Sequence, residues 1–196
     1  MAIPFKPTKE QVLAARDGQI EDVIAPGLRL LFCGINPGLY TAAVGHHFGR
    51  PGNRFWPALH RAGFTPRLLS PFDEAELLDY GYGITNLVNR ATARADEVAA
   101  EELVRGREIL AGKVRRFKPC FIAVLGVVAY RMAFERPKAS TGLQEEPLGS
   151  SRVWVLPNPS GINAHYLMDD LVRIFGELKS AVDGECPHNW RFPPES

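Results

Sequence analysis

Two short segments of the sequence combine an asparagine, a proline and a glycine in a way that could position a water molecule or an anion. They are residues 34–39 (Gly-Ile-Asn-Pro-Gly-Leu, the first Asn-Pro loop) and 158–163 (Asn-Pro-Ser-Gly-Ile-Asn, the second Asn-Pro loop). Each Asn-Pro pair predicts a rigid turn that orients an amide side chain and exposes backbone N–H groups. Such an amide can orient a water molecule, but it cannot take its proton near pH 7. For either segment alone, an ordinary strand-exit turn is the alternative.

The segment from His46 to Trp56 mixes aromatic rings with arginines on a chain punctuated by glycine and proline. Rings that stack on bases and arginines that hold phosphates are what an extruded nucleotide requires. Phe48, flanked by polar residues and glycine, is the stacking candidate, whereas Phe55 and Trp56 are predicted to be core residues of a helix. We expect no metal at His46-His47, because adjacent residues rarely ligate one ion and no third ligand is evident.

Nearly continuous apolar runs predict buried parallel strands, and amphipathic stretches between them predict helices. The strands are expected at residues 28–35, 83–88, 121–126 and 153–156. The helices are expected at 53–60, at 97–118, from the end of the third strand to 134, and at 166–182. This alternation predicts an α/β fold, a single-domain three-layer sandwich whose short, mainly parallel sheet is covered by helices on both faces. Both Asn-Pro loops follow strands, and ligands of such sheets bind beyond the carboxyl ends of the strands.

Charge is unevenly distributed along the chain, although the net formal charge is only +1. Residues 23–72, 109–134 and 147–168 contain no aspartate or glutamate, yet they hold many of the arginines and lysines. If these stretches converge in the fold, they form a positive face that attracts phosphates. The alternative is that acidic residues are simply missing from buried strands and loops.

At these motifs the chain resembles the mismatch-specific uracil (and thymine) DNA glycosylase family of the uracil-DNA glycosylase superfamily. The resemblance rests on Gly-Ile-Asn-Pro-Gly at 34–38, Asn-Arg-Phe-Trp at 53–56 and Asn-Pro-Ser-Gly at 158–161, and it extends over about residues 21–182. The paired motifs are specific together and weak singly. Residues 1–20 are then predicted to be an N-terminal helical extension, 21–182 the catalytic domain and 183–196 a flexible C-terminal tail.

The resemblance implies a role for several residues around the base. Asn36 matches the catalytic asparagine that positions the attacking water, and Phe48 matches the ring that stacks on the flipped base. Backbone groups around Ile35 and Phe48 would bond the uracil edge, and Thr41 would lie near the uracil 5-position. The residues expected around the base are Ile35, Gly38, Thr41, Phe48 and Asn86. Asn86 stands where the family often has a lysine.

The second Asn-Pro loop matches the segment that enters the duplex and reads the widowed guanine. The expected residues are Asn158, Ser160, Gly161, Ile162 and Asn163, with Ile162 as the apolar wedge; the alternative is that Ile162 fills space locally. Asn163-Ala164-His165 departs from the Ser-Arg that close relatives commonly have. The expected phosphate contacts are Arg50, Arg54 and His165.

Asp96 follows a loop of small residues beyond the predicted strand at 83–88. It could act as a base, or as an electrostatic partner of the cationic sugar. The alternative is that Asp96 caps the long helix predicted from Glu97. The two roles are compatible.

The sequence thus predicts a monomeric, monofunctional DNA N-glycosylase that acts on uracil mispaired with guanine in double-stranded DNA, without a metal or cofactor. The rivals are a non-catalytic nucleotide- or phosphate-binding α/β protein and a small-molecule N-glycoside hydrolase. No apolar run approaches the roughly 18–20 residues of a membrane span, so no membrane partner is expected. Cys33, Cys120 and Cys186 are an odd, widely spaced set. They argue against a disulfide framework or a four-cysteine metal site and fit a reducing cytoplasm.

Overall fold

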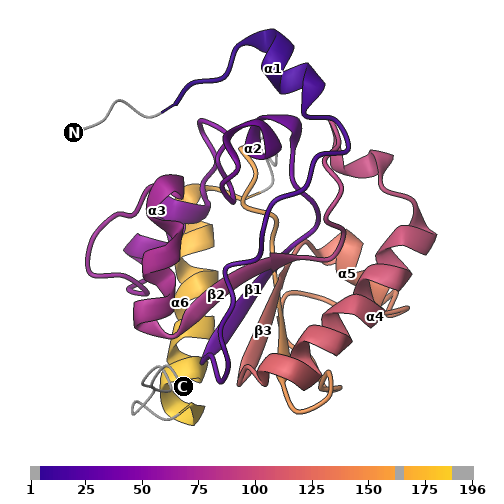
Figure 1. Cartoon of the computed structure of the whole chain (residues 1–196). Helices are drawn as coiled ribbons and strands as arrows, with labels where there is room; N and C mark the ends of the chain where they lie inside the picture. The colour runs from indigo at the N-terminus through magenta and orange to yellow at the C-terminus, as the bar shows by residue number, and fades with distance from the viewer. Residues whose placement is uncertain (1–4, 162–165, 187–196) are drawn as a thin grey trace, which may run out of the picture.

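A five-stranded sheet runs through the centre of the molecule (Figure 1). The computed structural model describes residues 5–161 and 166–186. The strand order is β2-β1-β3-β5-β4, in which β4 is antiparallel to β5 and the other pairs are parallel. The strands are β1 (Leu30–Gly34), β2 (Tyr82–Asn86), β3 (Phe121–Leu125), β4 (Gly142–Leu143) and β5 (Arg152–Leu156). The predicted fold class is confirmed.

Helices cover both faces of the sheet (Figure 1). One face packs against α3 (Phe55–Arg61), α6 (Met168–Glu185) and the 3-10 helix η1 (Pro71–Tyr80). The other packs against α4 (Ala100–Phe117) and α5 (Val127–Ala133). Because successive strand side chains point to opposite faces, each central strand serves both cores. This explains why their apolar runs are continuous.

The remaining elements are short and belong to the edge of the sheet where β1 and β2 end. They are α1 (Lys9–Ala14), α2 (Leu39–Val44) and the 3-10 helix η2 (Ala95–Glu97). The segment after α1 pairs with the loop that follows β2, since Asp17 N donates to Ala91 O and Ala91 N donates to Gly18 O. The N-terminal extension therefore contacts the loops at this edge.

The predicted cap of the long helix is wrong. Helix α4 begins at Ala100, and its N-cap is Ala99, whose N–H donates to Glu102 Oε2 at 3.1 Å. Asp96 lies in the separate helix η2. Between the two helices Val98 is extended and buried, so burial of this apolar side chain interrupts the helical path that the sequence pattern favoured.

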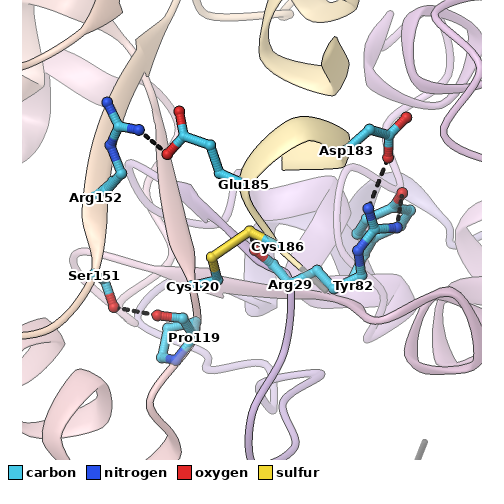
Figure 2. The surroundings of a disulfide bond; sticks show 9 residues. All are labelled: Arg29, Tyr82, Pro119, Cys120, Ser151, Arg152, Asp183, Glu185 and Cys186. Carbon is cyan, nitrogen blue, oxygen red and sulfur yellow. Dashed lines mark hydrogen bonds and ion pairs between the residues drawn. A yellow bond between two sulfur atoms is a disulfide. The ribbon is translucent and has the colours of Figure 1, made fainter. Parts of the chain in front are cut away.

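Two of the three cysteines form a disulfide (Figure 2), although their odd number and wide spacing argued against a disulfide framework. Cys120 precedes β3 and Cys186 follows α6, and 66 positions separate them in sequence. They meet because α6 returns along the sheet to the edge where the parallel strands begin. Cys33 is buried, and burial raises the pKa of its thiol to about 12, which keeps it protonated.

The end of α6 is anchored to the sheet, although residues 183–196 were expected to form a flexible tail. Asp183 pairs with Arg29 at 2.7 Å and Glu185 pairs with Arg152 (Figure 2). The sheet-facing side of the helix thus extends beyond Val182 as far as Cys186. Residues 187–196 lie outside the described part of the chain.

Candidate functional site

The first Asn-Pro loop lies beside the loop that follows β2, at the carboxyl edge of the sheet. Leu87 N donates to Gly34 O and Val88 N donates to Ile35 O, both at 2.9 Å. Farther along, Thr92 N donates to Pro37 O at 3.2 Å. The two chains therefore continue side by side after the strands end, which brings residues 89–92 against Asn36.

The Asn36 side chain is held in one orientation. Its Nδ2 donates to Arg90 O at 3.0 Å and to Thr92 Oγ1 at 2.7 Å. A carbonyl accepts only, and the single proton of the Thr92 hydroxyl is directed at Arg94 O at 2.6 Å, so both partners must accept from Asn36. Among the described residues no donor contacts Oδ1. The amide oxygen is thus the group that Asn36 can offer to a water molecule.

The loop that holds Asn36 is itself tied down by Arg90. The Arg90 guanidinium pairs with Glu102 at 2.9 Å and with Asp17 at 3.1 Å. The hydrogen bond from Arg90 lowers the pKa of the Glu102 carboxyl, so this link between the loop and α4 stays charged at neutral pH. Thr92 and Arg90 were not singled out from the sequence, since both roles depend on segments distant in the chain.

Phe48 lies at the centre of the same edge. Its ring stacks on Phe55, with the ring centroids 4.0 Å apart and the planes 23° from parallel, and its φ of 53° is in the left-handed region. Because Phe55 covers one face of the ring, a base could stack only on the other. Phe55 and Trp56 are buried core residues, as predicted.

Two side chains, those of Glu74 and Trp56, hold the backbone next to Phe48. Glu74 of η1 accepts from His47 N at 2.7 Å and contacts His46 Nδ1 at 2.8 Å, while Trp56 Nε1 donates to His47 O at 3.3 Å. Burial lowers the pKa of His47, although Glu74 opposes this effect. The two imidazole rings have different partners, since His46 Nδ1 contacts Glu74 whereas His47 Nε2 contacts Glu21 O at 3.0 Å. A role for Glu74 could not be foreseen, because η1 and this loop meet only in the folded chain.

Asn86 ends β2 with a buried, incompletely paired amide. A Cβ on Gly34 would lie 2.5 Å from Asn86 Oδ1 and 3.6 Å from Phe48 Cζ, so glycine at 34 lets both side chains approach the strand. Asn86 is 6% exposed, and its Nδ2 has no hydrogen-bond partner among the described residues. A buried donor left unpaired costs about 1–3 kcal/mol, which a ligand's acceptor could recover.

The other residues expected around the base are Ile35, Gly38 and Thr41, and each has different surroundings in the structure. Ile35 packs over Gly126 at the start of α5. Gly38 is the exposed N-cap of α2, and Thr41 is buried in that helix. Helix α2 lies against Gly49, where a Cβ would come within 2.5 Å of Val44. Thr41 therefore borders the loop that carries Phe48.

The second Asn-Pro loop meets the first through the residues before α3. Strand β3 lies between β1 and β5, so the loops do not leave neighbouring strands. Asn158 Oδ1 accepts from Ser160 N at 2.9 Å, as an Asx turn does, and Gly161 approaches Gly52. Ile162, Asn163 and His165 lie outside the described residues.

The two candidate arginines are placed differently. Arg50 is exposed and forms no ion pair with the described residues. Arg54 instead directs its guanidinium at three backbone carbonyls, those of Pro159, Ser160 and Tyr166.

Asp96 is exposed, and its carboxylate pairs with Arg94 at 2.6 Å. It belongs to the same loop as Thr92, whose hydroxyl links Asn36 to Arg94 O. The structure therefore puts Asp96 on the segment that positions Asn36, with its carboxylate held by a neighbouring arginine.

The three acid-free stretches do not converge into one positive face. Five of their eleven lysines and arginines pair with acids from other segments, as Arg29–Asp183, Arg61–Asp169, Arg67–Glu76, Lys113–Asp22 and Arg152–Glu185. Arg115, Arg116 and Lys118 lie at the end of α4, next to the beginning of β3 and therefore opposite the Asn-Pro loops. The distribution of charge along the sequence was misleading, because cations of the acid-free stretches pair with acids from other parts of the chain.

In residues 5–161 and 166–186, no group of three or more His, Cys, Asp or Glu side chains is arranged to hold a metal ion, and none of the helices has the length and apolar character to span a membrane. A hollow of about 590 Å³ opens beside Tyr130, Arg136 and Leu143. It contains no residue of either Asn-Pro loop.

Comparison with known proteins shows the family of the chain. Residues 21–179 match the family model of the uracil DNA glycosylase superfamily. The chain belongs to this superfamily. Membership implies DNA N-glycosylase activity, the hydrolysis of the bond between a base and its deoxyribose. The matched residues include both Asn-Pro loops and the Phe48 segment.

A solved structure shares the fold of this glycosylase. It is the solution structure of a protein from Methanosarcina acetivorans proposed to be a uracil DNA glycosylase. The two chains are 18% identical and superpose with a TM-score of 0.57, over 83% of this chain and 98% of the other. At this identity the likeness concerns the fold.

Proposed function

We propose that the protein excises uracil from G·U mismatches in double-stranded DNA as a monofunctional glycosylase, leaving an abasic site. Thymine and modified pyrimidines are further candidate substrates. The observation that carries the proposal is the buried, unpaired Nδ2 of Asn86 beside the Phe48 ring. A flipped uracil stacked on Phe48 would accept a hydrogen bond from Asn86 Nδ2 at its O4 carbonyl and donate its N3–H to Asn86 Oδ1.

Catalysis follows from how Asn36 and Asn86 are held. Bond cleavage produces an oxocarbenium-like sugar and an anionic base, so a positioned water and donors aimed at the base lower the barrier. Asn36 Oδ1 orients the water, because Nδ2 is committed to Arg90 O and Thr92 Oγ1. Asn86 Nδ2 stabilises the leaving base as its charge develops. Neither amide is a base, which predicts modest turnover.

Asp96 is the proposed carboxylate assistant, acting as a base or as an electrostatic partner of the sugar. Its ion pair with Arg94 is exposed on both sides, and exposed pairs are worth only about 0–1 kcal/mol. The pair can therefore open when a substrate binds.

Mismatch preference is proposed to come from the cost of extruding the base. Unstacking costs a few kcal/mol and is least at a mismatch. The second Asn-Pro loop, with Ile162 as the wedge, would fill the vacated position, and neighbouring groups at Asn158 to Asn163 would read the guanine. The protein is proposed to act as a cytoplasmic monomer, associated with the nucleoid when bound to DNA, and to need no metal or cofactor.

The test uses 5′-labelled duplexes that contain G·U, A·U or G·T, together with single-stranded uracil DNA. Alkali cleaves the abasic sites after incubation with excess protein. We expect cleavage of G·U at the highest single-turnover rate. Binding without cleavage of any uracil substrate would favour the non-catalytic phosphate-binding alternative, and indifference to all these DNAs would favour a small-molecule N-glycoside hydrolase.

Variants assign the roles within the same assay. Asn36→Ala should lower the single-turnover rate by about 100-fold or more, since it removes the group that orients the water. Asp96→Asn should lower it by about several-fold to tenfold, within the range of acid–base or electrostatic assistance. Asp79→Asn, an exposed charge change on η1, is the matched control and should match the wild type. Full activity of Asn36→Ala would refute its assigned role, and full activity of Asp96→Asn would remove Asp96 from the mechanism.

A further inference from the structure

We infer that Arg54 is a positioning residue that fastens the second Asn-Pro loop to the base-binding side of the site, and so sets how this loop meets duplex DNA. The inference rests on the proposed function, in which that loop enters the duplex. It replaces the expected phosphate contact with a different role for the same side chain.

The contacts of Arg54 lie on both sides of residues 162–165. Nη2 donates to Ser160 O at 2.8 Å and Nη1 donates to Tyr166 O at 2.5 Å. A longer contact of 3.4 Å joins Nε to Pro159 O, which also accepts from the Arg54 backbone N–H at 3.1 Å. One guanidinium therefore connects the segment that enters this part of the loop with the segment that leaves it.

A second, backbone contact fits the same arrangement. A Cβ on Gly161 would lie 2.8 Å from Gly52 O, and a backbone atom cannot move aside cheaply. Glycine at 161 thus allows the loop to lie directly on the residues before Arg54. The second Asn-Pro loop and the residues before α3 are therefore in contact through the backbone at Gly161 and through the side chain of Arg54.

Arg54 also lies in a chain of contacts that reaches the base-stacking ring. Asn53 Oδ1 accepts from Phe55 N at 2.9 Å and holds the start of α3, and Phe55 carries the stacked ring of Phe48. Residues 53–55 therefore join the surface proposed to receive the base to the loop proposed to replace it. Their relative position is what base extrusion requires.

The chemistry favours carbonyl binding over phosphate binding for this arginine. A guanidinium offers five N–H donors in a rigid plane, which suits several acceptors in fixed directions. Bonds from a charged donor are also stronger than those between neutral groups. A cation at the beginning of a helix opposes the helix dipole, so α3 itself has no electrostatic need for Arg54. To reach a phosphate, the side chain would have to leave these carbonyls.

The first test compares Arg54→Lys and Arg54→Met on two substrates, a G·U duplex and a duplex with uracil in a single-nucleotide bulge. A lysine keeps the charge but cannot bond three separated carbonyls. We expect both variants to lose about 10- to 100-fold in single-turnover rate on G·U, yet to stay within about threefold of wild type on the bulge, where extrusion costs less. Arg173→Met, at an exposed position on α6, should retain wild-type rates on both.

Salt dependence separates the two roles of an arginine. When a phosphate contact is lost, the slope of the logarithm of the DNA-binding constant against the logarithm of the salt concentration decreases in magnitude by about one. We expect Arg50→Met to show this change, and Arg54→Lys and Arg54→Met to keep the wild-type slope. A wild-type rate for Arg54→Lys on G·U, or equal losses on both substrates with a reduced slope for Arg54→Met, would overturn the inference.

Hydrogen exchange tests the contact without relying on activity. The amides of residues 158, 160, 161, 166 and 167 should exchange faster in Arg54→Lys than in wild type, while those of β1 should be unchanged. Unchanged exchange in this segment would overturn the inference even if Arg54→Met failed to fold. If wild-type protein cleaves no uracil DNA, the proposed function fails, whereas the exchange result still decides whether Arg54 holds the loop.

Discussion

The hydrogen bond donated by the Thr92 hydroxyl determines which end of the Asn36 amide is available to a ligand. The Thr92 hydroxyl donates to Arg94 O, so toward Asn36 it can only accept. This selects one of the two amide orientations and directs Oδ1 toward the site. The sequence shows that an asparagine is present, but not which of its two ends is available.

Replacing Thr92 with valine tests this control of orientation. Thr92→Val keeps the shape of the side chain but removes the acceptor at the shortest contact, leaving Arg90 O at 3.0 Å and Pro37 O at 3.2 Å to hold the Asn36 amide. We expect the single-turnover rate on G·U DNA to fall by about 10- to 100-fold, as small misplacements of reacting groups do.

The matched control is Thr92→Ser, which restores the hydroxyl and should recover most of the lost rate. The free energy of unfolding should fall by about 1–3 kcal/mol in Thr92→Val, because Thr92 is buried and its hydrogen bonds are lost. A Thr92→Val protein with the wild-type rate would show that the backbone carbonyls of Arg90 and Pro37 suffice to hold the Asn36 amide.

The apolar strands were predictable to within about two residues, whereas the short helices around the site were not. Each central strand is buried on both faces, so its sequence is a continuous apolar run. Helix α2 spans six residues between two glycines, and η1 has few buried side chains. Both owe their conformation to contacts with distant segments rather than to periodicity.

The burial of His47 in the loop before Phe48 predicts a pH dependence of stability. Burial lowers the pKa of His47, so the folded protein binds this proton less readily than the unfolded chain, whose histidine titrates near pH 6.5. The free energy of unfolding should therefore be fully retained above about pH 6.5 and should decrease as the pH falls below that value, until the lowered pKa is reached.

Urea unfolding between pH 7.5 and 5 measures this effect, and one proton contributes at most about 1.4 kcal/mol per pH unit. His47→Gln should have a flatter profile over the same interval because its side chain does not titrate. Profiles of equal slope for the two proteins would assign the pH dependence to other groups.

The arrangement of the complete chain, rather than its order, determines which charges and cysteines meet. Acids from other segments pair with five of the eleven lysines and arginines in the acid-free stretches, and the return of α6 along the sheet brings Cys186 to Cys120. Disulfides that close long loops restrict the unfolded chain, by about 4 kcal/mol for a loop of this length in the chain-entropy model.

Reduction should accordingly destabilise the protein without changing its fold. We expect a reductant to lower the free energy of unfolding by about 2–5 kcal/mol, the usual range for a native disulfide. Thermal unfolding with and without dithiothreitol measures the change. The Cys120→Ser/Cys186→Ser variant should be insensitive to the reductant. Three titratable thiols in unfolded protein that was never reduced would show that the bond does not form.

The amino-acid sequence was sufficient for the α/β class, the four parallel strands and the two Asn-Pro loops, because burial on both strand faces and turn chemistry are local properties of the chain, but it was not sufficient for the short antiparallel strand β4. Side-chain orientation required the fold. The direction of the Asn36 amide, the unpaired donor of Asn86 and the carbonyls bound by Arg54 all depend on partners more than 50 positions away or on the packing of two strands. Hydrogen bonds select donors and acceptors over about 3 Å, and distances of that order are defined only once the chain has folded.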